Sequence, residues 1–178
     1  MRMKLLTIFF ALSALLFSRG LYLSSYSLGK HLKKEQVYDG YKCGGENVSP
    51  DLHWRSTLKG VKSFAVTIHD IDASINNGWW HWVVFNIPRN VRTIKKGASN
   101  LKLLPYGAKE GRNDYGFIGY GGACPPKKER AHRYVTTLYA LDVSKLHIEK
   151  GATPFEIYQA IKKHTIAKSV IVSRYRRK

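Results

Sequence analysis

The sequence predicts a mainly β protein, an antiparallel β-sandwich with a few short peripheral helices. Three stretches, at residues 63–70, 82–87 and 133–141, have the alternating or β-branched and aromatic composition of strands. One segment, which starts at Thr153, carries a strong helix signal. The 178 residues, 44% of them hydrophobic, suit a single folded domain and leave no room for two sizeable cores.

The first part of the chain has the three-part pattern of a secretory signal peptide, residues 1–20. Two basic residues come first, and residues 5–17 then form an uncharged apolar run, shorter than the roughly 20 residues that span a bilayer. Small residues follow at the positions that a signal peptidase reads, so we expect cleavage after Gly20. The mature domain would cover residues 21–178 and would be periplasmic or secreted. An uncleaved membrane anchor and a buried strand are the alternatives.

The remaining elements follow in chain order. Residues 21–28 alternate enough to predict a first strand, and residues 30–47 are polar and glycine-containing, which predicts a loop. Six glycines between residues 107 and 122 predict a long loop of the kind that is usually functional or disordered. Residues 170–172 predict one more strand.

The helix signal rests on local chemistry. Thr153 is a candidate N-cap, Pro154 suits the first helical position, and Glu156 completes a Thr-x-x-Glu capping box. An apolar stripe follows, and the helix should end near His164.

The charge balance is strongly basic. Lys and Arg number 30 against 12 Asp and Glu, which gives a net charge of +18. Removal of the predicted signal would leave 27 basic and 12 acidic residues, a net +15 on the mature domain. An excess of this size predicts an anionic partner, such as a phosphate-bearing molecule, a lipid headgroup or an anionic membrane surface contacted peripherally. Export argues against nucleic acid as that partner.

The chain has two cysteines, Cys43 and Cys124, too few for an all-thiolate zinc site or a disulfide-rich scaffold. An oxidising compartment would let them form a disulfide, which would close a loop of roughly 80 residues and stabilise the fold by about 4–5 kcal/mol through loop entropy. Two free buried thiols are an equally good interpretation.

Polar side chains share the phase of the apolar ones at one end of the predicted strands. Asp70 ends the strand predicted at residues 63–70, and His81 precedes the one at 82–87. His132 and Tyr134 lie at the start of the one at 133–141. The residues in phase with them are Phe64, Val66 and Ile68; Val83, Phe85 and Ile87; and Thr136, Leu138 and Ala140. An inward-facing carboxylate or imidazole is costly unless it is paired or binds a ligand. We therefore expect the four polar residues to converge, with a purely structural Asp70–His81 pair as the alternative.

Two enzymatic alternatives can be weighed. A zinc site could combine His69, His81 and His132, but His69 is out of phase with Asp70 and should face the other side of the sheet. A phosphoester hydrolase could use Asp70, His81 and His132 as acid and base, but the sequence lacks both a Gly-x-Ser-x-Gly motif and a Walker loop. We expect a binding protein without a catalytic residue, metal or cofactor.

Four motifs stand out in order along the chain. They are residues 43–54 (Cys-Gly-Gly-Glu-Asn-Val-Ser-Pro-Asp-Leu-His-Trp), residues 70–74 (Asp-Ile-Asp-Ala-Ser), residues 81–84 (His-Trp-Val-Val), and residues 119–126 (Gly-Tyr-Gly-Gly-Ala-Cys-Pro-Pro) followed by His132-Arg133-Tyr134. Together they resemble the phosphatidylethanolamine-binding protein family, in its bacterial branch similar to Raf kinase inhibitor protein. The resemblance extends over residues 21–177.

This resemblance implies an antiparallel β-sandwich with a small pocket for phosphate or phosphoethanolamine, and a protein partner such as a kinase or protease. Matched position by position, the pocket would comprise Asp70, His81, Gly122, Pro125, Pro126, His132 and Tyr134. In this interpretation the imidazoles and Tyr134 donate hydrogen bonds to phosphate, and Gly122 lets the backbone approach closely.

The sequence departs from the family pattern in three places. Ile71 and Ser74 replace prolines in the acidic motif, and Ala123 replaces the proline before Cys124. Residues 127–131 are unusually basic, and we expect them to draw anions towards the pocket; a solvated loop is the alternative. A further alternative for the whole protein is a cationic surface that binds anionic lipid or polysaccharide through the basic C-terminal residues.

Overall fold

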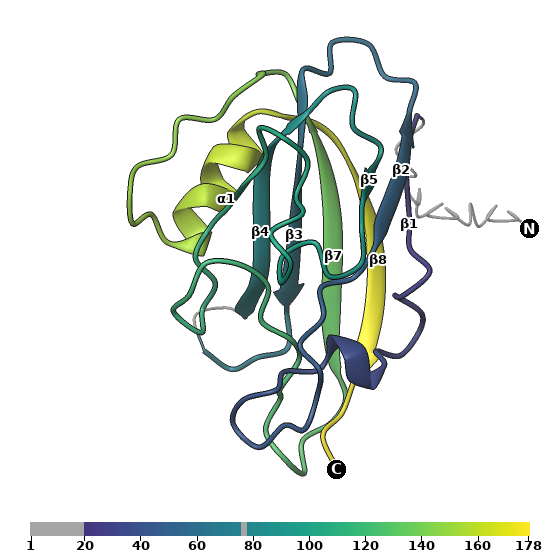
Figure 1. Cartoon of the computed structure of the whole chain (residues 1–178), viewed down its shortest axis with the longest axis vertical. Coiled ribbons are helices and arrows are strands. Elements are labelled where there is room, and N and C mark those ends of the chain that lie inside the picture. Colours follow the sequence, from purple (N-terminus) through teal and green to yellow (C-terminus); the bar gives the residue numbers. More distant parts are fainter. Residues whose placement is uncertain (1–19, 76–77) are drawn as a thin grey trace, which may run out of the picture.

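The computed structural model describes residues 20–75 and 78–178, so the predicted signal peptide lies, except for Gly20, outside the described residues. Figure 1 shows a larger and a smaller sheet, with the helix α1 beside the larger one. The larger, five-stranded antiparallel sheet has the strand order β6-β4-β3-β7-β8. Its strands are β3 (Ser63–Asp70), β4 (Trp79–Pro88), β6 (Lys109–Glu110), β7 (His132–Leu141) and β8 (Thr165–Tyr175).

The smaller sheet has the strand order β1-β2-β5 and is also antiparallel. It contains β1 (Leu21–Ser24), β2 (Leu52–Ser56) and β5 (Thr93–Ile94). The helical elements are a 3-10 turn, η1 (Lys34–Gln36), and α1 (Pro154–Lys163). The predicted mainly β sandwich is therefore confirmed, and β2, β5 and β6 are the strands that the sequence patterns did not predict; β6 lies in the predicted glycine-containing loop.

Two hydrophobic clusters lie on the two faces of the larger sheet. Between the sheets, Phe64 and Val66 of β3 pack with Leu52 and Trp54 of β2. On the other face, side chains of β3, β4 and β7 pack with Ile157 and Ile161 of α1; they include Ala65, Val83, Phe85 and Tyr139. Both faces of β3 are thus covered, which explains its nearly continuous burial.

The capping box of α1 forms as predicted. The Thr153 hydroxyl accepts a hydrogen bond from the backbone N–H of Glu156, whose carboxylate accepts one from the backbone N–H of Thr153 at 2.7 Å. The helix ends at Lys163 with His164 as its C-cap. Among the described residues, no helix is long and apolar enough to cross a membrane.

Strand β4 interrupts the expected alternation twice. Its register with β3 passes from Ile68↔Trp82 to His69↔Trp80, which leaves His81 as an extra, unpaired residue. A second shift comes before Ile87, next to Asn86, whose φ is 58°. The prediction that Val83, Phe85 and Ile87 share one face was therefore wrong: the first two pack towards α1, and Ile87 packs between the sheets.

Candidate functional site

A pocket of about 320 Å³ lies where β3 ends and β4 and β7 begin. Its walls include Asp70, His81, His132 and Tyr134, together with Pro125 and Pro126, so six of the seven predicted site residues line it. The seventh, Gly122, does not. Tyr41, Trp79, Tyr115, Cys124 and Glu129 also contribute to what we call the strand-end pocket.

Pairing in the sheet explains this convergence. Tyr134 of β7 and Trp79 of β4 are the register partners of Asp70, one on each side of β3. His81 would face α1 in a regular strand, because Trp82 faces the space between the sheets. The extra residue in β4 instead lets His81 line the pocket with Asp70 and Tyr134. The expected convergence is correct, but it depends on a bulge and not on simple alternation.

His132 lies between two carboxylates. Its Nδ1 is 2.8 Å from Asp70 Oδ2 and its Nε2 is 2.8 Å from Glu129 Oε2, while its side chain is only 2% exposed. Burial by itself lowers the pKa of His132, but the hydrogen bonds to Asp70 and Glu129 outweigh it and raise that pKa. An imidazolium that donates from both nitrogens fits this arrangement.

Asp70 orients His132 and also holds the loop that follows β3. Its Oδ1 accepts hydrogen bonds from the backbone N–H groups of Asp72 and Ala73, at 3.0 and 3.2 Å. Within the described residues, no hydrogen bond joins Asp70 to His81, so the imidazole paired with Asp70 is that of His132. The alternative of a structural Asp70–His81 pair does not describe the site.

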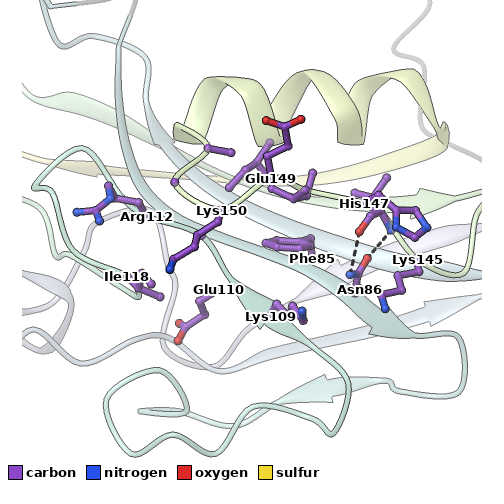
Figure 2. Close-up of a pocket in the computed structure, with 16 residues that line it drawn as sticks. Phe85, Asn86, Lys109, Glu110, Arg112, Ile118, Lys145, His147, Glu149 and Lys150 are labelled. Carbon is purple, nitrogen blue, oxygen red and sulfur yellow. Dashed lines mark hydrogen bonds between the residues drawn. The ribbon is translucent and has the colours of Figure 1, made fainter.

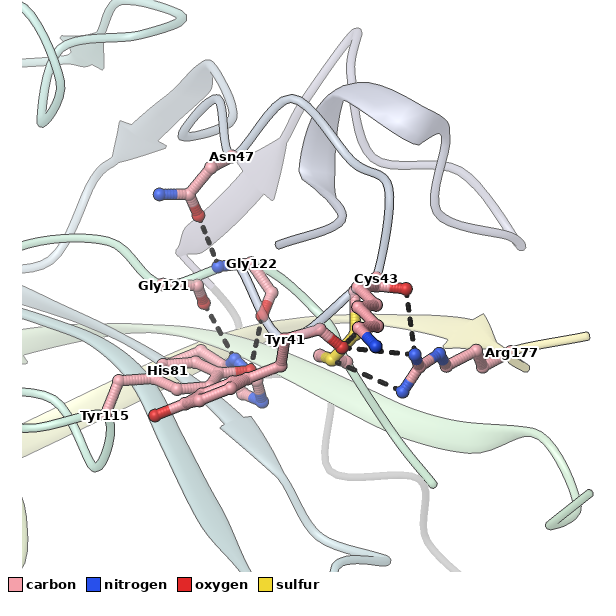
Figure 3. Close-up of a disulfide and its surroundings, with 10 residues drawn as sticks. Tyr41, Cys43, Asn47, His81, Tyr115, Gly121, Gly122 and Arg177 are labelled. Carbon is pink, nitrogen blue, oxygen red and sulfur yellow. Dashed lines mark hydrogen bonds between the residues drawn. A yellow bond between two sulfur atoms is a disulfide. The ribbon is translucent and has the colours of Figure 1, made fainter. Parts of the chain in front are cut away.

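His81 has a different environment. Its Nδ1–H donates to the carbonyl oxygen of Gly121 at 2.7 Å (Figure 3), which leaves Nε2 as a hydrogen-bond acceptor when the ring is neutral. Burial lowers the pKa of His81. The ring is therefore neutral near pH 7. It packs edge-to-face on Tyr134, with the two ring centroids 5.2 Å apart.

Two residues that line the pocket carry buried donors. The hydroxyl of Tyr134 and the indole nitrogen of Trp79 form no hydrogen bond of normal geometry with any described residue, although the Tyr134 hydroxyl lies near the Asp70 carboxylate. Burial and the nearby negative charge of Asp70 raise the pKa of Tyr134, so the hydroxyl keeps its proton. Because an unpaired buried donor costs about 1–3 kcal/mol, these groups mark a place where a ligand acceptor would be stabilising.

The acidic loop is held without its family prolines. Asp72 accepts two hydrogen bonds from the Arg133 guanidinium, at 2.8 and 2.7 Å, and this pairing holds the pKa of Asp72 well below its usual range. The N–H of Ile71 donates to the carbonyl of Arg133 at 3.2 Å, a bond that proline could not make. The Arg133 guanidinium and one backbone hydrogen bond thus hold this loop in place.

The Cys43–Cys124 disulfide forms (Figure 3), with the two Cα atoms 5.8 Å apart. Cys124 lines the strand-end pocket, so the bridge ties the pocket wall to the segment around Tyr41. Arg177 reinforces this segment by donating to the carbonyl oxygens of Tyr41 and Lys42, at 3.1 and 2.8 Å.

Gly122 supports the pocket from behind. Its N–H donates to Asn47 Oδ1 at 2.7 Å and its carbonyl accepts from the Tyr115 hydroxyl at 2.8 Å (Figure 3). A Cβ at this position would lie 2.5 Å from the backbone nitrogen of Tyr38. The absence of a side chain at Gly122 therefore allows the chain around Tyr38 to pack closely against it.

The sequence patterns did not single out Glu129, Tyr115 or Tyr41. Glu129 is the one acid within residues 127–131, and the basic residues around it predicted only that this segment attracts anions. Arg130 of this segment pairs with Asp72 at 3.1 Å. His69 faces away from the pocket, as its phase predicted, and stacks on Trp80 with a centroid distance of 4.0 Å. In the described part of the chain, no group of three or more His, Cys, Asp and Glu could hold a metal ion.

Known proteins share this sequence pattern. The family described as phosphatidylethanolamine-binding protein matches residues 24–176. The UPF0098 protein YbcL of Escherichia coli (strain K12) is 39% identical over 149 residues, which is 83% of this chain and 81% of YbcL. The UPF0098 protein YbhB of the same strain is 38% identical over 148 residues, 83% of this chain and 93% of YbhB.

Solved structures share the fold. The crystal structure of E. coli YbcL, described as a new member of the mammalian PEBP family, covers 89% of this chain and 99% of its own, with a TM-score of 0.85 and 37% identity. The homologue CT736 of Chlamydia trachomatis covers 90% of this chain, with a TM-score of 0.73 and 29% identity. The chain therefore belongs to the phosphatidylethanolamine-binding protein family, in the bacterial branch that contains YbhB and YbcL.

Proposed function

We propose that the strand-end pocket binds the phosphate group of a small molecule or lipid headgroup, and that no bond is broken there. One observation carries this proposal: Tyr134 and Trp79, whose buried donors have no hydrogen-bond partner among the described residues, line the same pocket as His132, whose pKa is raised by Asp70 and Glu129. Phosphate oxygens are strong acceptors that can satisfy several donors at once. Membership of the phosphatidylethanolamine-binding protein family supports the same ligand class.

The binding geometry follows from the existing hydrogen bonds. One phosphate oxygen would accept from Tyr134 and Trp79, and another would take the place of the Glu129 carboxylate at His132 Nε2. Glu129 can move out, because its side chain is 44% exposed. A phosphate that carries a proton could donate it in a hydrogen bond to Nε2 of the neutral His81. Asp70 would keep its hydrogen bond to His132 throughout.

The proposal includes a cellular setting. The signal-like N-terminus supports a periplasmic or secreted protein, and a disulfide is compatible with an oxidising compartment. The protein would also bind a partner such as a kinase or protease. Ligand binding in the pocket would release this partner and so change its activity. The family resemblance supports this part of the proposal.

Titration of the protein with inorganic phosphate and phosphoethanolamine, by calorimetry and by NMR of the histidine rings, tests the pocket. Tyr134→Phe removes one hydroxyl and should weaken binding about tenfold, the effect of one hydrogen bond to a charged acceptor. Tyr139→Phe is the matched control, because the Tyr139 hydroxyl is paired with Thr67 on the other face of the sheet. Absence of binding to the wild type, or equal losses in both variants, would overturn the proposal.

A further inference from the structure

A second cavity, of about 710 Å³, lies on the helix-covered side of the larger sheet (Figure 2). It is open to solvent and is lined by residues of β4, β6, the residues after β6, and the segment that leads into α1. We call it the helix-side cavity. Its volume is in the range of sites that bind small molecules.

The floor of the helix-side cavity is apolar and firmly held. Phe85 and Leu146 are buried there, and Ile157 closes the floor from α1. The Asn86 side chain fixes the facing segment, since its amide donates to the Leu146 carbonyl at 3.2 Å and its Oδ1 accepts from the Leu146 N–H at 2.7 Å. Gly111 packs so closely on α1 that a Cβ would lie 2.4 Å from Ile157 Cδ1. Such a floor is built before any ligand arrives.

The rim of the cavity is cationic. Lys109, Arg112, Lys145 and Lys150 all line it, and each of these four residues is exposed. None of them forms an ion pair with another residue in the described ranges. Figure 2 shows the ammonium group of Lys150 reaching over the floor between Ile118 and Phe85.

The two acids of the rim, Glu110 and Glu149, offset part of the positive charge but form no ion pair with the four cations among the described residues. Glu110 accepts a hydrogen bond from the buried indole of Trp82 at 2.6 Å. The Glu149 carboxylate points away from the floor in Figure 2. An apolar floor therefore lies under cations without carboxylate partners, and next to it Ile118 leaves 66% of its surface exposed.

We propose that the helix-side cavity binds a small amphipathic anion, with its acidic group among Lys109, Arg112 and Lys150 and its apolar part against Phe85 and Ile118. A purely polar anion would leave the apolar floor wet, and an uncharged apolar molecule would leave the cations unused. This site is separate from the strand-end pocket and does not depend on phosphate binding there. It gives part of the chain's excess positive charge a ligand.

Dodecanoate, below its micellar concentration, is a suitable probe, because its carboxylate keeps it distinct from phosphate. Amide NMR shifts should change at Gly111, Ile118 and Gly151, and calorimetry should give the affinity. Acetate and dodecyltrimethylammonium, which carry the acid alone and the opposite charge, should bind at least about tenfold more weakly. Raising the salt concentration about tenfold should weaken dodecanoate binding, because the cations are exposed to solvent.

Variants locate the site. The triple variant Lys109→Gln, Arg112→Gln and Lys150→Gln should bind dodecanoate about tenfold more weakly, from the combined loss of three exposed ion contacts. Lys150→Gln alone should show a smaller loss. A control variant removes three exposed cations that lie outside the cavity, Lys33, Arg55 and Lys59, and should change the affinity by less than about twofold.

Three results would overturn the proposal: no dodecanoate binding to the wild type, equal losses in the triple variant and its control, or shifts confined to the strand-end pocket. The phosphate titration of Tyr134→Phe is independent of all three, so a failure at one site leaves the other proposal standing.

Discussion

The two cavities handle charge in opposite ways. In the strand-end pocket the His132 ring is already hydrogen bonded to Asp70 and Glu129, which raise its pKa, and burial lowers the pKa of His81. In the helix-side cavity four exposed cations have no carboxylate partner among the described residues. The excess charge of the chain therefore does not show where its most organised polar site lies. In the two proposals, donor geometry binds the ligand in the first cavity and Coulombic attraction binds it in the second.

The largest expected effect is a loss of stability when the buried His132–Asp70 pair is broken, compared with the removal of an exposed cation. His132→Ala should lower the free energy of unfolding by about 3–5 kcal/mol, because it leaves the buried carboxylate of Asp70 without its charge partner. Lys150→Ala, on the rim of the helix-side cavity, should change it by less than about 0.5 kcal/mol. Urea unfolding followed by circular dichroism measures both. A loss below about 1 kcal/mol for His132→Ala would mean that the network contributes little to stability.

The sequence could predict the elements that local residues determine, and not those that depend on pairing with distant strands. Local chemistry determines α1, whose capping box involves residues three apart, and alternation determines β3. The two residues of β5 carry no such signal. The β4 bulges depend on pairing with β3, so the phase of Ile87 relative to Val83 and Phe85 could not be predicted from β4 alone.

The site residues also differ in how far the sequence could predict them. Asp70, His132 and Tyr134 were predictable because unbulged strands bring their phases together. Glu129 was not, because it reaches His132 from a loop and only the folded chain places it there. Gly122 was predicted through the resemblance as a place of close approach to a ligand; the structure shows that its missing Cβ leaves room for the chain around Tyr38, and its contact with a ligand stays a prediction.

The Glu129 carboxylate should compete with phosphate for the Nε2 position of His132. Glu129→Gln should bind phosphate about tenfold more tightly at about pH 6, because a neutral amide holds His132 Nε2 less strongly than a carboxylate and removes repulsion towards the anion. Calorimetry measures the change. Glu149→Gln, which removes an exposed acid from the helix-side cavity, is the matched control and should leave phosphate affinity unchanged. Unchanged or weaker binding in Glu129→Gln would show that the carboxylate does not occupy the anion position.

The smallest expected effect is a pH dependence in which the two pocket histidines have opposite signs. The pKa of His132 is raised in the folded state, so its contribution to stability is complete below the unfolded pKa of about 6.5 and is lost as pH rises through the folded pKa. The pKa of His81 is lowered, so its contribution is present above about 6.5 and is lost as pH falls through the folded pKa.

Urea unfolding at several pH values between about 5 and 8 should therefore show Glu129→Gln losing less stability than the wild type on the alkaline side, because one of the two hydrogen bonds that raise the pKa of His132 no longer involves a charge. On the acid side the two proteins should change in parallel, since the burial of His81 is the same in both. NMR titration of the His132 ring checks the cause directly, and its pKa should be lower in Glu129→Gln. Parallel curves over the whole range, with the same His132 pKa, would show that Glu129 does not influence the imidazolium.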